Sequence, residues 1–213
     1  MDIIDEVKQE LSEENVHRLI KKYSPLIFGM MVAIIIGITA GLWWKSYRAD
    51  KIHQDGGQYL KAILEMKTYK PDEAIKTFET IANNNTTYGV FAGLNIGAFK
   101  YFKKDYAESQ KWYSGISDNS SNEQSFRDLA ELMKIKAMIA NDANAELSIK
   151  ALETYIKHNP TYKNSAEELL AMLYIQNNKP EKANEVLNLL VTDTTAPNTI
   201  KERAEQLLAL VKK

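Results

Sequence analysis

The chain has 213 residues, and its 27 basic and 28 acidic side chains give a net charge of −1. It contains no cysteine, which excludes disulfides, thiolate catalysis and metal centres held by cysteine. A near-neutral surface of mixed sign also lacks the positive field on which nucleic-acid binding depends, so we expect no nucleic-acid partner.

The first predicted element is a membrane-spanning helix. Leu26 to Trp44 is an uncharged run of 19 residues, the length that a helix needs to cross a hydrocarbon core of about 30 Å. Tyr23, Trp43 and Tyr47 stand where interfacial aromatic residues belong. A cleaved signal peptide is disfavoured, because the run is too long and six acidic residues precede it. We therefore predict a tail at 1–24, a span at 25–45 and a domain at 46–213.

Small residues recur at every fourth position of this span, namely Gly29, Ala33, Gly37 and Gly41. They form one stripe on the helix, which lets a second helix approach closely, and we expect a helix contact there. The alternative is that glycine is simply common in membrane helices. Four basic residues flank the span on each side, so the positive-inside rule does not decide its orientation.

After the span the sequence predicts helices throughout, because no alternating strand pattern of any length occurs. Four segments carry a small residue followed four positions later by a large apolar one. The small residues are spaced by 35, 39 and 35 positions, close to the tetratricopeptide period of about 34. In such repeats, the small residues lie where the two helices of a hairpin cross. The four pairs are Ala74 with Phe78, Ser109 with Tyr113, Ser148 with Leu152, and Ala183 with Leu187.

Ala62, Gly97 and Ala171 are expected to hold the facing crossing positions on the first helices of three hairpins. In the third hairpin, either Ala130 or Ala137 is expected to hold the crossing position on the first helix. The 39-residue spacing between Ser109 and Ser148 predicts about five extra residues around 141–145. The segment 198–210 is interpreted as a capping helix with a polar face. The predicted fold class is all-α, with one N-terminal transmembrane helix and then a tetratricopeptide-like helical-hairpin solenoid with a C-terminal capping helix. A generic helical bundle is the alternative.

The sequence offers little for catalysis. No known catalytic or nucleotide-binding pattern is present, and the three histidines are scattered at His17, His53 and His158. Two acidic pairs are expected in the first turns of helices, where the helix dipole favours carboxylates. These pairs are Asp72 with Glu73 and Glu167 with Glu168. We therefore predict no enzyme, no catalytic residue, and no cofactor or metal.

Protein binding is the function that stacked hairpins favour, because their first helices line a concave face that accepts an extended chain or a helix. Tyr59 and Tyr101 are expected to present their hydroxyls to water on this face. The alternative is that about half of the candidate positions are ordinary core. The candidate positions are large and mostly apolar: Tyr59, Ile63, Met66, Phe91, Leu94, Ala98, Tyr101, Phe102, Met172 and Ile175.

The order of these features resembles the YfgM-type ancillary subunits of the bacterial SecYEG translocon. The segment from Asn85 to Gly97 is similar to that family's N-x-TYG-x-x-A-x-L pattern, and Trp43, Trp44 and Tyr47 are similar to its aromatic cluster. From the residues alone, the segment is interpreted as a folding signature, in which Thr86 or Thr87 caps a helix and glycines admit a neighbouring helix.

The resemblance implies a single-pass protein of the bacterial inner membrane, with its N-terminus in the cytoplasm and its C-terminal domain in the periplasm. It implies help in the transfer or chaperoning of newly exported proteins. The implied partners are the SecYEG translocon, a periplasmic membrane-anchored chaperone and exported client proteins. The alternative function is a scaffold or regulator of an envelope complex that makes no contact with secretory clients.

Overall fold

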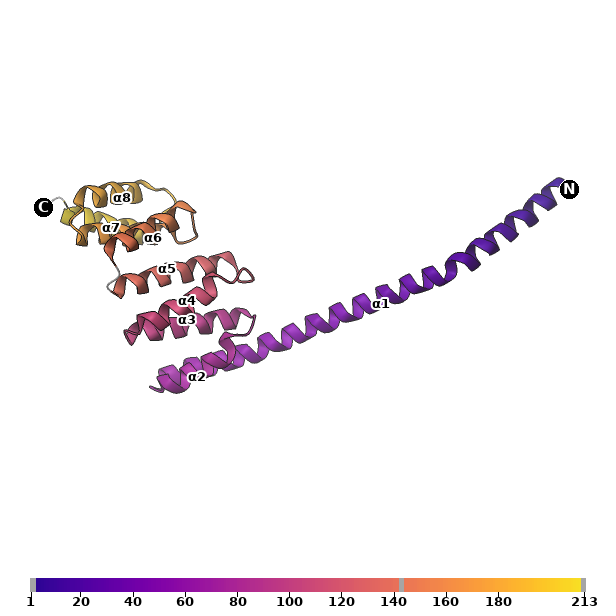
Figure 1. The fold of residues 1–213 in the computed structure, drawn as a ribbon, viewed down its shortest axis with the longest axis horizontal. Coiled ribbons are helices and arrows are strands. Elements are labelled where there is room, and N and C mark those ends of the chain that lie inside the picture. The colour runs from indigo at the N-terminus through magenta and orange to yellow at the C-terminus, as the bar shows by residue number, and fades with distance from the viewer. Residues whose placement is uncertain (1–2, 142–143, 212–213) are drawn as a thin grey trace. The chain divides into compact units, whose positions relative to one another are not determined.

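The computed structural model describes residues 3–141 and 144–211, and every regular element within them is an α-helix. The chain divides into two compact units, Met1–His53 and Gln54–Lys213. Helix α1 contributes to both and passes the expected domain start at residue 46 without a break. The helices are α1 (Ile3–Lys67), α2 (Pro71–Ala82), α3 (Thr87–Phe102), α4 (Tyr106–Ser117), α5 (Gln124–Ala140), α6 (Ala145–Lys157), α7 (Lys163–Gln176), α8 (Pro180–Thr192) and α9 (Asn198–Val211) (Figure 1).

The first unit carries the apolar run. Among the described residues, one helix is long and apolar enough to cross a membrane, in a segment that begins at Phe28. Its apolar stretch is entirely exposed, and Trp43 stacks on Tyr47 with ring centroids 5.9 Å apart. Apart from the chain neighbours and the backbone of the same helix, no described atom lies within 4 Å of the place where a Cβ on Gly29, Gly37 or Gly41 would stand. The helix contact through this stripe stays a prediction.

In the second unit, consecutive helices pair into four hairpins. The end of α1 pairs with α2, α3 with α4, α5 with α6, and α7 with α8, while α9 packs against α8 and α7. Among the described residues, the main contacts join helices that are adjacent or next to adjacent in the chain. This stepwise stacking is the pattern of a repeat array.

Three of the hairpins share one turn geometry. The middle residue of each turn is left-handed, with φ of 59° at Tyr69, 60° at Lys104 and 53° at Asn178. The next residue donates its N–H to a carbonyl five positions earlier at 2.9 Å in all three turns, which satisfies a carbonyl at the end of the first helix. Pro71 and Pro180 then begin the second helix of their hairpins, where proline lacks only an N–H that has no partner in the helix.

The predicted crossing pairs are confirmed by their burial. All eight side chains of these pairs are at most 4% exposed. Gly97 shows why a small residue is needed, because a Cβ there would stand 2.7 Å from the ring of Tyr113. At the same crossing, the Ser109 hydroxyl donates to the Gly97 carbonyl at 2.8 Å.

The third hairpin differs from the expectation. Ala130 and Ala137 are both buried, but Ala130 packs with Tyr113 and Ile116 of α4. Ile135 stands five residues before the end of α5, as Ala62, Gly97 and Ala171 do in their helices, and it packs in one cluster with Leu152. This larger side chain occupies the crossing position. Among the described residues, the Ser148 hydroxyl is buried without a hydrogen-bond partner, unlike Ser109.

The extra residues of this repeat are also not gathered around 141–145. The connection 141–144 is one residue longer than the three-residue turns of the other hairpins, whereas the connection 118–123 before α5 has six residues against four before α3. A hydrogen bond from Asn122 Nδ2 to the Ile116 carbonyl, at 3.0 Å, holds the longer connection against the end of α4. The insertion is therefore spread along the repeat.

The acidic pair on α7 is a further correction. Helix α7 begins at Lys163, so Glu167 and Glu168 lie beyond its first turn, whereas Asp72 and Glu73 lie in the first turn of α2 as expected. Glu168 accepts from both Nε and Nη2 of Arg203 on α9, the latter at 2.7 Å. Burial raises the pKa of Glu167, against the opposing effect of Lys163. Glu168 therefore helps to join the capping helix to the last hairpin.

Candidate protein-binding site

A buried carboxylate holds the turn that begins the 85–97 segment. Asp55 on α1 is 1% exposed, and its two oxygens accept from Asn84 Nδ2 at 2.8 Å and from the Thr86 hydroxyl at 2.7 Å. Thr86 caps α3 and accepts from the Gly89 N–H at 3.2 Å. A Cβ on Gly89 would stand 2.3 Å from the Asn84 carbonyl oxygen. These contacts explain the residue types of the segment as a folding signature.

The same arrangement recurs, and we call it the polar latch: a polar side chain on a first helix that bonds the connection after the second helix. Asp128 accepts from the Thr161 N–H at 2.7 Å and from the Thr161 hydroxyl at 2.8 Å. Asn164 donates to Asp193 at 2.9 Å. The second repeat has Val90 at the corresponding place. The three latch residues stand seven positions before the crossing residues: Asp55 before Ala62, Asp128 before Ile135, and Asn164 before Ala171.

The Asp128 latch makes stability depend on pH. Burial alone would raise the pKa of Asp128, but hydrogen bonds from Thr161 and Gln124 outweigh it and hold the pKa below its ordinary value. A carboxyl with a lowered pKa stabilises the fold above its ordinary pKa, and this contribution is lost as the pH falls through the folded value. We expect the urea midpoint to drop between about pH 6 and about pH 3. In Asp128→Asn the midpoint should be lower at about pH 6 and should fall less; equal slopes would contradict the assignment.

Four aromatic rings from three successive first helices form a continuous group, which we call the aromatic row. It consists of Tyr59, Tyr88, Phe91 and Phe126 from α1, α3 and α5, all partly exposed. The centroid of Phe91 lies 6.1 Å from Tyr59, 6.4 Å from Tyr88 and 5.3 Å from Phe126. Asn95 fixes one end, because its Nδ2 donates to the Tyr59 hydroxyl at 3.1 Å and to the Phe91 carbonyl at 2.8 Å.

The structure thus brings Tyr59 and Phe91 together, and it changes the expectation for Tyr59. This hydroxyl faces Asn95, and the ring packs 5.4 Å from the buried Phe78, so Tyr59 is partly core. Sequence reasoning missed Tyr88 and Phe126. The available signal was their shared repeat position, because Tyr88 stands nine positions before Gly97 and Phe126 stands nine positions before Ile135.

The other candidate positions lie in separate places. Ile63 and Met66 pack against the first core cluster, and Leu94 packs against the cluster of α4 and α5. Tyr101 and Phe102 form an edge-on ring pair at the end of α3, where Phe102 is 82% exposed. On α7, Met172 is 40% exposed, while Ile175 is partly buried between the last two core clusters. Their joint use as one binding groove stays a prediction.

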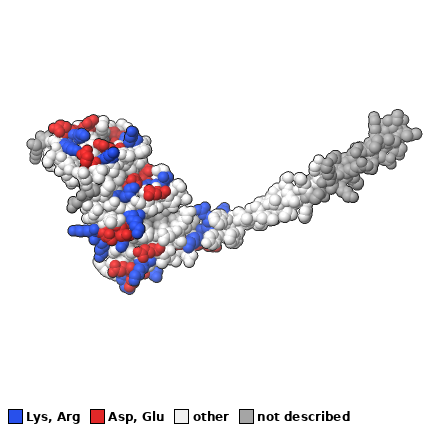
Figure 2. Space-filling view, viewed as in Figure 1, with Lys and Arg blue, Asp and Glu red and all other residues white. Residues whose placement is uncertain are grey.

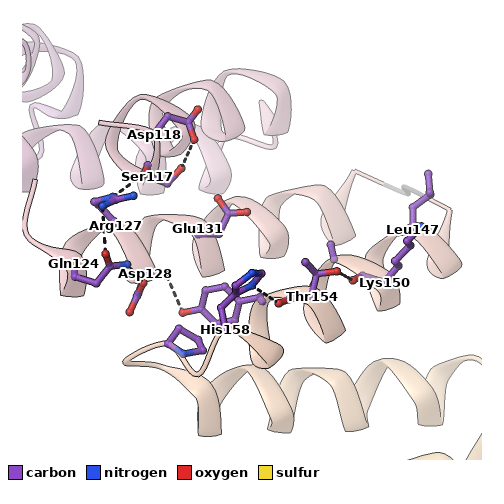
Figure 3. A pocket seen from close by; sticks show the side chains of 13 residues that line it. Ser117, Asp118, Gln124, Arg127, Asp128, Glu131, Leu147, Lys150, Thr154 and His158 are labelled. Carbon is purple, nitrogen blue, oxygen red and sulfur yellow. Dashed lines mark hydrogen bonds between the residues drawn. The ribbon is translucent and has the colours of Figure 1, made fainter. Parts of the chain in front are cut away.

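A separate cavity, with a volume of about 530 Å³, lies between the end of α4, α5 and α6 (Figure 3). Its carboxylates are engaged, since Glu131 pairs with Lys134 and Asp128 accepts from Thr161. The His158 Nδ1 faces the Thr154 carbonyl at 2.8 Å. Nucleophilic catalysis uses an imidazole that is hydrogen-bonded to a hydroxyl or a carboxylate. Within the described residues, the His158 imidazole makes no such hydrogen bond. The described residues also hold no group of three acidic or histidine side chains suited to a metal.

Charges of both signs are interspersed over the face of the second unit drawn in Figure 2, and the described apolar part of α1 is free of them. Such a surface gives no strong field of one sign to steer a highly charged ligand. The aromatic row therefore offers apolar contact and hydrogen bonding, and not charge, to whatever lies against it.

Comparison with one solved structure supports the fold. The aligned structure is that of nearly identical TPR-like repeats from a Podosopora anserina protein described as a kinesin light chain. It aligns with a TM-score of 0.53 at 13% identity, covering 73% of this chain and 83% of that one. A single-residue variant of the same repeats aligns with a TM-score of 0.49 at 13% identity, covering 73% and 92%. Among curated proteins, none matches this chain. The sequence matches the family described as protein of unknown function (DUF2659) over residues 1–211. The protein is therefore a member of the DUF2659 family.

Proposed function

We propose that this protein is a membrane-anchored protein-binding module at the Sec translocon. In this proposal, its tetratricopeptide-like domain stands in the periplasm and assists the transfer or chaperoning of newly exported proteins. The observation that carries the proposal is the aromatic row on a repeat fold that follows one apolar helix. The link to the translocon rests on the resemblance of residues 85–97 and of the aromatic residues that follow the span.

The aromatic row suits a protein ligand for two physical reasons. Aromatic side chains contribute a disproportionate share of the energy at protein interfaces. The rings are also held in place before binding, by mutual contacts of 5.3 to 6.4 Å and by the hydrogen bond from Asn95 to Tyr59, so little side-chain entropy is lost when a partner docks. The strongly exposed Phe102 extends the apolar surface of α3.

The periplasmic location is tested by a reporter enzyme that is active only outside the cytoplasm, fused after Lys213. We expect full activity, because the resemblance implies a periplasmic C-terminal domain and one span places the two ends of the chain on opposite sides of the membrane. The matched control carries the same reporter before Met1 and should be inactive. The reverse pattern would place the domain in the cytoplasm and would remove the export role.

One observation favours the second candidate function, a scaffold or regulator of an envelope complex. Gly29, Gly37 and Gly41 of the stripe carry no side chain that would hold a partner helix away, so its backbone can approach closely. A stable membrane partner is what a scaffold requires. Replacing Gly37 and Gly41 with leucine should then release that partner while leaving the domain folded, since lipid gives no hydrophobic drive to compensate for lost packing.

A further inference from the structure

A small cavity beside the 85–97 segment differs in chemistry from the rest of the surface. It has a volume of about 200 Å³ and lies between the α2–α3 connection, α4 and the α4–α5 connection. Although 26% of the chain is charged, none of the side chains that line this cavity carries a charge. Five of them are asparagines: Asn83, Asn84, Asn85, Asn119 and Asn122.

Turn formation accounts for only part of these amides. Asn119 Oδ1 accepts from the Ser121 N–H at 3.0 Å, and Asn122 Nδ2 donates to the Ile116 carbonyl, as asparagines in turns commonly do. The Asn119 Nδ2 and the Asn122 Oδ1 remain available for hydrogen bonds to a ligand. In the described part of the chain, the exposed amides of Asn83 and Asn85 make no hydrogen bond at all. The cavity therefore presents several donors and acceptors that the fold does not use.

Trp112 and Gly115 also line the cavity. Trp112 is partly buried against the first core cluster, which holds its ring in place. Gly115 lies on α4, and apart from its chain neighbours and the backbone of its own helix, no described atom lies within 4 Å of the point where a Cβ would stand. The absent side chain thus leaves room for a ligand beside the indole.

We infer that this cavity binds a neutral sugar ring. Amide groups match hydroxyls, because each amide offers both a donor and an acceptor. The apolar face of a sugar can pack against the indole of Trp112, as ligands do in pockets that combine aromatic walls with a few polar groups. A charged ligand would find no charged partner among the lining side chains and would lose hydration on entry. The cavity volume limits the site to about one ring.

The test measures binding of methyl glycosides of glucose and N-acetylglucosamine to the full chain, by isothermal titration in a detergent without sugar headgroups. Gly115→Leu fills the cavity while replacing a helical glycine, so its melting temperature should be equal to or higher than that of the unmodified protein. Its sugar affinity should fall by about tenfold or more. Gly57→Leu is the matched control, because Gly57 is also helical with no described atom within 4 Å of a Cβ, but lies outside the cavity.

Retained binding in Gly57→Leu together with loss in Gly115→Leu would support the assignment. Absence of binding by both glycosides, or equal binding in the two leucine variants, would overturn it. Equal or tighter binding of methyl glucuronide would overturn the preference for a neutral ring. The inference is independent of the translocon role, because the cavity is separate from the aromatic row.

Discussion

Phe78→Ala should lower the free energy of unfolding by about 3 to 5 kcal/mol, the usual loss when a fully buried phenylalanine leaves a cavity. Phe78 is completely buried at the first hairpin crossing, beside Ala62 and Ala74 and in one cluster with Ile96 of α3. The cavity would therefore weaken three helices at once. Urea unfolding of the full chain in micelles, followed by far-ultraviolet circular dichroism, measures the loss.

The matched control is Phe102→Ala, which removes the same ring from a position that is 82% exposed. This change should alter the free energy of unfolding by no more than about 0.5 kcal/mol. Similar losses in the two variants would mean that the register of the first two repeats is wrong. A loss confined to Phe78→Ala would support the crossing positions counted from the small residues.

Asp55→Ala should cost about 3 kcal/mol, because it leaves two donors, Asn84 Nδ2 and the Thr86 hydroxyl, without their acceptor at a buried site. The turn before α3 would lose its connection to α1, so hydrogen exchange of the Gly89 amide should become faster. Asp72→Ala is the control, since Asp72 is an exposed residue in the first turn of α2 and contributes at most about 1 kcal/mol. Equal losses in the two variants would contradict the latch.

The repeat architecture could be predicted because it follows from the regular spacing of small and large apolar residues along the sequence. The crossing pairs and the capping helix each depend on residues close together in the chain. The third hairpin was misjudged because Ile135 replaces the small residue that the period leads one to expect. Two alanines nearby then offered a plausible but wrong alternative.

The polar latches and the full aromatic row could not be predicted in the same way. Asp55 bonds residues 29 and 31 positions away, and no local pattern shows which asparagine or threonine a buried carboxylate will meet. Tyr59 was expected to face water, but its surroundings come from Tyr88 and Phe91 of the next repeat. Contacts between repeats therefore decide which candidate residues are core and which remain open to a partner.

The central claim is that the face formed by the first helices contacts exported proteins. The direct measurement is photo-crosslinking in living cells from an amino acid with a photoreactive side chain, placed at Phe102 on α3. Leu189 on α8 is the control position, since it is 64% exposed on a second helix. We expect nascent secretory chains among the adducts from position 102 and few adducts from position 189. A single stable envelope protein at position 102, or equal adducts from both positions, would contradict the claim.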